Sequence, residues 1–463
     1  MPKGCCGMRK IYTATVLLIC LTGAVWPVTV YWDGSSDGDW SNASNWSSFP
    51  AIPGAGDDVI VENVGTAPSS NVTGSYLSLT VDLGVNLTLN GNMTLTNAVT
   101  IDGTLSVGGN TLTAGSIGGT GTLNGNTGTI RVSGGFAPGA FAGGTGSVEL
   151  TGGNAQTIAD PYVFSTLFID KTGGSATFTA VTTASTLTTT AAAYNVAFTN
   201  DLSISSASVT FTNSGSLTLG DSFDDTLAFT AGVIATAPSS INSRGTVSTT
   251  NQDIILGDGD TGLTLTGLLT LDAGSGDINL GGTVNGGSSL RLQTSGTSTL
   301  SGIIGGVTAL SNLITDAGGS TVINTTLVRT SGAQNYGDAV TLGANAVLTS
   351  TVNGDVTFSS TVNGGQTLSI GNGTGTVTFG GTVGNATALT SVSVTSLTST
   401  TAINTTQVRT TGAQAYSGAV TLGANAVLTS TVNGDLTFSG AVSGARDLSL
   451  TTNGSGIVVF GGD

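Results

Sequence analysis

The sequence predicts an all-β protein built as a β-solenoid, and three observations support that fold class. Apolar residues recur in pairs with the two-residue spacing of a β-strand, in which successive side chains point to opposite faces. Glycine and asparagine stand between these pairs, where tight turns need them. A long segment in the C-terminal half recurs unchanged further along the chain, which indicates a repeat architecture.

The composition favours strands and turns over an ordinary globular enzyme or a disordered chain. Among the 463 residues, 72 are glycine, and only 8% are charged, against about 25% in a typical globular domain. Hydrophobic residues still make up 38%, whereas disordered chains combine few branched aliphatic residues with much charge. The surface must therefore consist largely of threonine, serine, asparagine and glycine.

The strand pattern is clearest between residues 85 and 107. The apolar pairs there are Leu87/Leu89, Met93/Leu95, Val99/Ile101 and Leu105/Val107. Each pair begins six residues after the previous one, and turn-forming residues such as Asn90-Gly91 lie between them. Three such strands predict a coil of about 18 residues around an apolar core.

A longer repeat covers the C-terminal half. Residues 339–355 (AVTLGANAVLTSTVNGD) are identical to residues 419–435, and residues 321–330 match residues 401–410 closely. A fainter copy begins at Gly276, where GDINLGGTVNGG resembles GDVTFSSTVNGG at Gly354. We interpret the period of 80 as a duplicated unit of about four coils with about 20 residues each. Duplicated globular domains are the alternative, but helical periodicity of 3.6 is lacking here. The last copy stops early, which predicts a truncated C-terminus.

The N-terminal residues have the pattern of a signal peptide, which we assign to residues 1–24. Three basic residues (Lys3, Arg9 and Lys10) precede an apolar run at 11–21, and small residues follow up to Ala24. The run is too short for a comfortable membrane span, so we expect no integral membrane segment in the mature chain. All three cysteines (Cys5, Cys6 and Cys20) precede Ala24, which predicts a mature protein without thiols or disulfides.

The remainder is expected to form three parts. Residues 25–66 are an N-terminal capping segment, residues 67–240 a solenoid of irregular repeats, and residues 241–463 a solenoid with the longer repeat of period 80. The capping segment contains Trp32, Trp40 and Trp46, which we expect to cover the open apolar end of the solenoid as an aromatic cap. A carbohydrate-stacking platform is the alternative for these indoles.

Charge and histidine content exclude several functions. The chain has 10 basic and 26 acidic residues, a net charge of −16, and no basic stripe, so nucleic acid is not an expected partner. It contains no histidine, which excludes a Ser-His-Asp triad and histidine-ligated zinc.

Carboxylates remain as candidates for chemistry. Asp57-Asp58 and Asp224-Asp225 are adjacent pairs, but neighbours in a strand point to opposite faces and so cannot share a site there. Candidate calcium ligands occur in Gly-rich turns, at Asp33, Asp37 and Asp39 and at Gly257-Asp258-Gly259-Asp260. Because Asp and Gly also make turns for purely structural reasons, we predict no catalytic, cofactor-binding or metal residues and no cofactor.

Two stretches carry a resemblance to a known class. They comprise Tyr31–Gly34, Asp39-Trp40, Asn45-Trp46 and Pro53–Val61, and further on Gly146–Leu150, Ala155–Ile158 and Phe164–Ile169. These segments resemble large bacterial surface proteins with autotransporter-like or filamentous-haemagglutinin-like β-strand repeats. The resemblance implies a right-handed parallel β-helix exported to the cell surface or outer membrane, with adhesive or matrix roles. The family's C-terminal translocator barrel is not recognisable in this sequence.

These observations together predict a secreted or cell-surface structural and adhesive β-solenoid that is not an enzyme. Its expected partner is an unidentified surface or extracellular ligand, with carbohydrate among the candidates. The alternative function is that of an extracellular polysaccharide-binding or polysaccharide-degrading β-helix protein.

Overall fold

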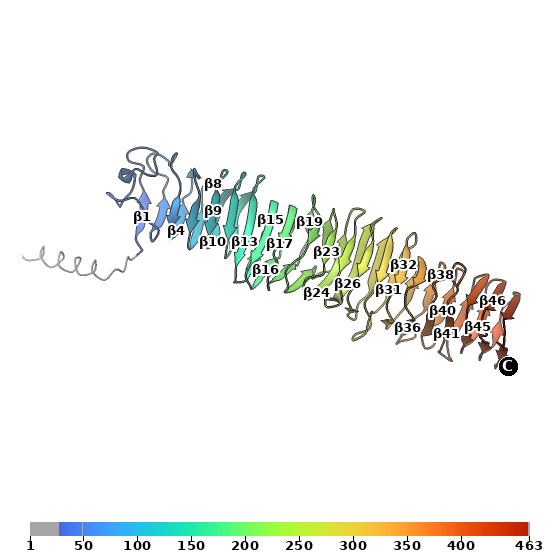
Figure 1. The fold of residues 1–463 in the computed structure, drawn as a ribbon. Helices are drawn as coiled ribbons and strands as arrows, with labels where there is room; N and C mark the ends of the chain where they lie inside the picture. The colour runs from blue at the N-terminus through green and yellow to red at the C-terminus, as the bar shows by residue number, and fades with distance from the viewer. Residues whose placement is uncertain (1–26, 49, 462–463) are drawn as a thin grey trace, which may run out of the picture. The chain divides into compact units, whose positions relative to one another are not determined.

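The computed structural model describes residues 27–48 and 50–461, so the predicted signal peptide and the three cysteines lie outside the described residues. The chain divides into two compact units, Met1–Ser147 and Val148–Asp463, which are described one at a time. In both, parallel strands stack coil upon coil (Figure 1), with about 19 turns in all. The prediction of an all-β solenoid is confirmed. Nowhere in the described ranges is there a helix long and apolar enough to cross a membrane.

Unit 1 contains short strands and one 3₁₀ turn, η1 (Ala43–Asn45). Its strands are β1 (Thr29–Trp32), β2 (Asp58–Val61), β3 (Gly74–Tyr76), β4 (Ser78–Val81), β5 (Asn86–Thr88), β6 (Met93–Leu95), β7 (Ala98–Ile101), β8 (Thr104–Ser106), β9 (Thr111–Ala114), β10 (Ser116–Asn124), β11 (Thr129–Val132) and β12 (Phe136–Ala142). One face runs from β1 through β2, β4 and β7 to β10, and a second runs through β5, β8 and β10.

The apolar pairs of unit 1 form its core. All eight residues of the four predicted pairs between 87 and 107 are buried. Leu87 on β5 pairs with Leu105 on β8, and Leu105 begins the third apolar pair after that of Leu87. The coil here therefore has the length of about 18 residues that the spacing predicts. Turn glycines are needed where coils approach closely: a side chain on Gly119, whose φ is 115°, would meet the carbonyl oxygen of Ile101 in the preceding coil.

Unit 2 begins with strands of more varied length. These are β13 (Ser147–Gly152), β14 (Gln156–Ile158), β15 (Val163–Lys171), β16 (Ser175–Phe178), β17 (Thr182–Thr189), β18 (Asn195–Phe198), β19 (Leu202–Ile204), β21 (Ser216–Leu219), β22 (Thr226–Phe229), β24 (Ser240–Ser248), β26 (Gly262–Gly274), β28 (Val284–Asn285) and β29 (Leu290–Thr294). Buried and exposed residues alternate along most of them, which is the pattern of strands with one side against the core.

Three faces, here named A, B and C, wind through the rest of unit 2. Face A comprises β20 (Val209–Thr210), β23 (Val233–Ala235), β25 (Ile254–Leu256), β27 (Ile278–Leu280), β30 (Thr297–Leu300), β32 (Ser320–Ile323), β35 (Ala339–Leu342) and β38 (Val362–Asn363), and after a bridge at Val383 it continues as β43 (Gln407–Thr410), β46 (Ala426–Ser430) and β49 (Leu448–Thr452). Face B comprises β33 (Leu327–Thr330), β36 (Ala346–Ser350), β39 (Thr367–Gly371), β41 (Ser391–Val394), β44 (Gln414–Tyr416), β47 (Leu436–Phe438) and β50 (Val458–Phe460). Face C includes β31 (Leu313–Thr315), β34 (Gln334–Tyr336), β37 (Val356–Phe358), β40 (Thr376–Phe379), β42 (Thr400–Ile403), β45 (Ala419–Leu422) and β48 (Val442–Ser443).

The longer repeat is one face short of the four coils that the period of 80 predicts. Thr321 on face A lies above Val340, Val362 and Val383 in the three coils that follow. Its counterpart Thr401 pairs with Val377 on face C instead. The repeat therefore spans three full coils and two further faces. Most coils here are longer than the expected 20 residues, and one such coil leads from Val340 to Val362.

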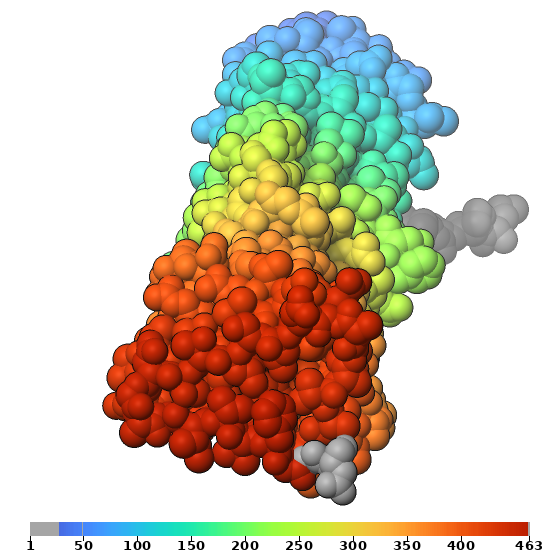
Figure 2. Space-filling model, turned by 90° about the vertical axis from the view of Figure 1, so that its right-hand side faces the viewer, coloured from blue at the N-terminus to red at the C-terminus, as the bar shows by residue number. Residues whose placement is uncertain are grey.

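Aromatic rings stack in the core of both repeat copies. On face C, Tyr336 stacks on Phe358 and Phe358 on Phe379, with centroid distances of 5.1 and 5.6 Å. On face B, Tyr416 and Phe438 are the counterparts of the first two rings, 5.4 Å apart. The last coil of the described chain, seen at the front in Figure 2, leaves β50 exposed along all three of its residues.

Candidate functional site

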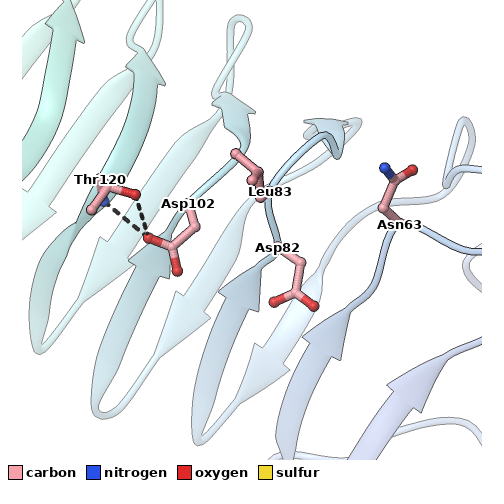
Figure 3. Close-up of a pocket in the computed structure, with 5 residues that line it drawn as sticks. All are labelled: Asn63, Asp82, Leu83, Asp102 and Thr120. Atoms are coloured by element: carbon pink, nitrogen blue, oxygen red, sulfur yellow. Dashed lines mark hydrogen bonds between the residues drawn. The ribbon is translucent and has the colours of Figure 1, made fainter.

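A groove on unit 1 is lined mainly by acidic and polar side chains. It is formed by Asn63, Asp82, Leu83, Asp102 and Thr120 and has a volume of about 520 Å³. These residues follow one corner of the solenoid from coil to coil, at or near the ends of β2, β4 and β7 and within β10 (Figure 3). At this corner Asp82 and Asp102 lie in successive coils, and neighbouring parallel strands are about 4.8 Å apart.

The carboxylate of Asp102 is hydrogen-bonded to the next coil. Its Oδ1 accepts hydrogen bonds from the backbone N–H of Thr120 at 3.0 Å and from the Thr120 hydroxyl at 2.8 Å. The backbone bond and then the hydroxyl bond lower the pKa of the Asp102 carboxyl. It therefore stays ionised at neutral pH, which does not suit a general acid. The groove offers a negative polar surface in which Leu83, 78% exposed, is the apolar member.

A smaller pocket of about 100 Å³ lies next to this groove. The loop at 62–68 forms one wall, and Gly84, Val85 and Asn86 at the start of β5 form the other. The loop at 62–68 thus lies along β5, which is the first strand of the face formed by β5, β8 and β10.

Asn and Asp side chains in the turns of both units bond to the backbone of a neighbouring coil. In the first repeat copy, Oδ1 of Asn353 accepts from the N–H of Thr374 at 3.0 Å, and Oδ1 of Asp355 accepts from the N–H of Thr376 at 2.7 Å. The second copy repeats both bonds from Asn433 and Asp435. The same bond type recurs at Asn92, Asn195, Asp201, Asn251, Asp253, Asp277, Asn285, Asn312, Asn345, Asn363 and Asn425. Many turn carboxylates and amides are therefore structural acceptors.

The calcium candidates near the N-terminus accept hydrogen bonds mainly within their own turns. Oδ1 of Asp33 accepts from the N–H of Ser35, and Oδ1 of Asp37 accepts from the N–H of Asp39. Asp39 accepts from the backbone and hydroxyl of Ser41 and from the amide of Asn71. These hydrogen bonds lower the pKa of Asp37 and Asp39. Turn formation thus accounts for the acids at this position.

The second calcium candidate also closes a turn. Oδ1 of Asp258 accepts from the N–H groups of Asp260 and Thr261, and these bonds lower its pKa. Within the described part of the chain, no three His, Cys, Asp or Glu side chains are grouped so that they could hold a metal ion.

The structure separates the members of the two adjacent Asp pairs. Asp57 accepts from the N–H of Gly54, whereas Asp58, at the start of β2, accepts from the hydroxyl of Ser78 in the next coil. Asp224 and Asp225 lie in the loop before β22 and not in a strand. Asp225 is buried and accepts from two N–H groups of its own loop, at Asp221 and Ser222.

The three tryptophans form a closed cluster in unit 1. They are at most 3% exposed, and every pair of indoles is in stacked or edge contact. The Trp40 Nε1 donates to the hydroxyl of Tyr76 at 2.7 Å, and the Trp46 Nε1 donates to the carbonyl oxygen of Trp40 at 2.9 Å. A sugar would need an open aromatic face, and these indoles do not offer one.

Two buried ionisable residues of unit 2 were not among the sequence candidates. Lys171 is 1% exposed, and its Nζ donates to Oε1 of Gln156 at 2.6 Å and to the carbonyl oxygen of Thr151. Burial lowers the pKa of this ammonium group. The other residue is Asp338, which is also 1% exposed. Strand alternation along β15 places Lys171 inward, two residues after Ile169, although lysine is ordinarily an exposed residue.

Comparison of the chain with protein-family models, with curated proteins and with solved structures gave no match.

Proposed function

We propose that this chain is a structural and adhesive β-solenoid of the bacterial cell surface, secreted and without catalytic activity. The observation that carries the proposal is the use of turn carboxylates and amides as acceptors for the backbone of a neighbouring coil, as at Asp102 and Asp355. Side chains bonded in this manner stabilise a stack of coils, and their oxygen atoms already serve as hydrogen-bond acceptors. A stable stack with a polar, hydroxyl-rich surface suits a protein that holds or contacts other extracellular material.

The aromatic cluster fits this proposal as an end cap. Residues 45–47 run along the free edge of β1: Asp33 N–H donates to the carbonyl oxygen of Asn45, and Ser47 N–H donates to that of Tyr31. Trp32 and Trp46 form an antiparallel bridge there. Edge strands otherwise invite pairing with other chains. We infer that this segment closes the N-terminal edge of the solenoid.

The proposal is tested by locating the protein and by measuring binding. Antibodies should detect the chain on intact cells or in the medium. The purified protein should retain immobilised extracellular glycans or matrix proteins and should leave soluble polysaccharides uncut. Release of reducing or unsaturated sugar ends by the protein would overturn the assignment in favour of a polysaccharide-degrading enzyme. Recovery in the cytoplasmic fraction alone would contradict the proposed location.

A further inference from the structure

A buried carboxyl group in unit 2 joins two successive coils. Asp338 lies in the turn before β35 and is 1% exposed. Its Oδ1 accepts from the backbone N–H of Gly319 at 2.8 Å, and its Oδ2 accepts from the hydroxyl of Thr321 at 3.3 Å. Gly319 and Thr321 belong to the preceding coil, in the turn at 316–319 and in β32. The carboxyl group therefore fastens this turn to the coil that follows.

The surroundings of Asp338 are unfavourable for a negative charge. Burial raises the pKa of the Asp338 carboxyl and the charge of Asp316 raises it further, while the hydrogen bonds from the Gly319 N–H and the Thr321 hydroxyl lower it without cancelling the rise. Asp316 is the titratable group of the preceding turn and itself accepts from the N–H of Thr294 one coil earlier. In the following coil, Thr361 bonds through its carbonyl oxygen to Val340 and brings no ionisable side chain.

The longer repeat supplies an internal comparison. The counterpart of Asp338 in the second copy is Gly418, which has no side chain. Thr401, the counterpart of Thr321, is fully buried and its hydroxyl has no hydrogen-bond partner among the residues described. The corresponding turn at 396–399 is closed by the hydroxyl of Ser399, which donates to the carbonyl oxygen of Ser396 at 2.8 Å. The two copies thus close the same turn with and without an ionisable group.

We propose that Asp338 makes the turn at residues 316–319 pH-sensitive, so that it is closed while the carboxyl group is protonated and opens when the group ionises. Transfer of an ionised carboxylate from water into a buried site is costly, and opening the turn returns the group to water. Because the pKa is raised in the fold, the stabilising contribution is present below the unfolded pKa and is lost as pH rises through the folded pKa. The turn at 396–399 has no such response.

Hydrogen exchange of the full chain, corrected for intrinsic rates, tests the proposal at pH 4 and pH 7. Protection at residues 316–321 should fall at least about threefold at the higher pH, while residues 396–401 keep their protection. Asp338→Asn keeps the size of the side chain and should remove the response. Asp316→Asn removes a charge that raises the pKa of Asp338, so ionisation should move to lower pH and the fall in protection between pH 4 and pH 7 should become smaller.

Two results would overturn the proposal. One is protection at 316–321 that is independent of pH in the wild-type protein, and the other is an unchanged pH response in Asp338→Asn. If Asp338→Asn does not fold, the comparison of the two turns within the wild-type molecule decides the question.

Discussion

Phe358 and Phe379 lie in successive coils with their rings almost parallel, at an interplanar angle of 4° and a centroid distance of 5.6 Å. The parallel register between β37 and β40 places the two residues directly opposite each other. This contact links two coils through the core, whereas the Asn and Asp bonds link coils through the turns. The stability of a solenoid depends on such neighbour contacts.

Phe358→Ala should lower the local free energy of unfolding by about 3–5 kcal/mol, because it opens a cavity between Tyr336 and Phe379. Hydrogen exchange should accelerate first in β34, β37 and β40. Phe223→Ala is the matched control, since Phe223 is 71% exposed and its loss should cost less than about 0.5 kcal/mol. Equal effects of the two substitutions would contradict the importance of the stack.

Asp355→Ala should destabilise the turn by about 1 kcal/mol, because the N–H of Thr376 loses its acceptor. Asp355→Asn retains Oδ1 and should be close to wild type. The amide of Ile457, bonded to Asp435 in the second copy, serves as a reference within the same molecule. Amide exchange at Thr376 and Ile457 reports on the Asp355 and Asp435 bonds separately. If Asp355→Asn were as unstable as Asp355→Ala, the charge of Asp355 would matter more than its acceptor oxygen.

Trp46→Ala tests the proposed N-terminal cap. Loss of a buried aromatic costs roughly 3–5 kcal/mol, and in a solenoid the loss should appear as faster exchange in β1 and β2 while distant coils hold. Trp46→Phe keeps an aromatic ring and should restore part of the protection. Unchanged protection in these strands, together with lost glycan binding, would instead support a carbohydrate platform.

Lys171→Met should change how stability depends on pH. Because burial lowers the pKa of Lys171 below its ordinary value of 10.5, the folded state binds this proton less well than the unfolded state. Wild-type stability should therefore rise, relative to the variant, as pH increases from the folded pKa toward 10.5. Urea unfolding of both proteins across this range measures the difference. A constant difference would show that Lys171 ionises in the fold as it does in water.

Much of the fold follows from the sequence, because residues such as Leu87 and Leu105 carry both the strand period and the coil length. The phase of the longer repeat does not follow. Turn lengths add up along the chain, so a few extra residues per coil move Thr401 to another face than Thr321. Asp338 escaped prediction because an acid before a strand is a common turn residue. The difference between Asp338 and Gly418 in otherwise similar copies is the one signal that marks it.

The mismatch between repeat and coil has a consequence for what the surface presents. Identical residues at 339–342 and 419–422 lie on faces A and C, so the same sequence is displayed in two directions. Duplication in this register spreads a surface motif around the solenoid axis, and a third copy would take the remaining face. A cysteine introduced at Thr341 and one at Thr421 would therefore label different sides of unit 2, although their sequence contexts are the same. Each added copy makes the display less dependent on the side from which a partner approaches.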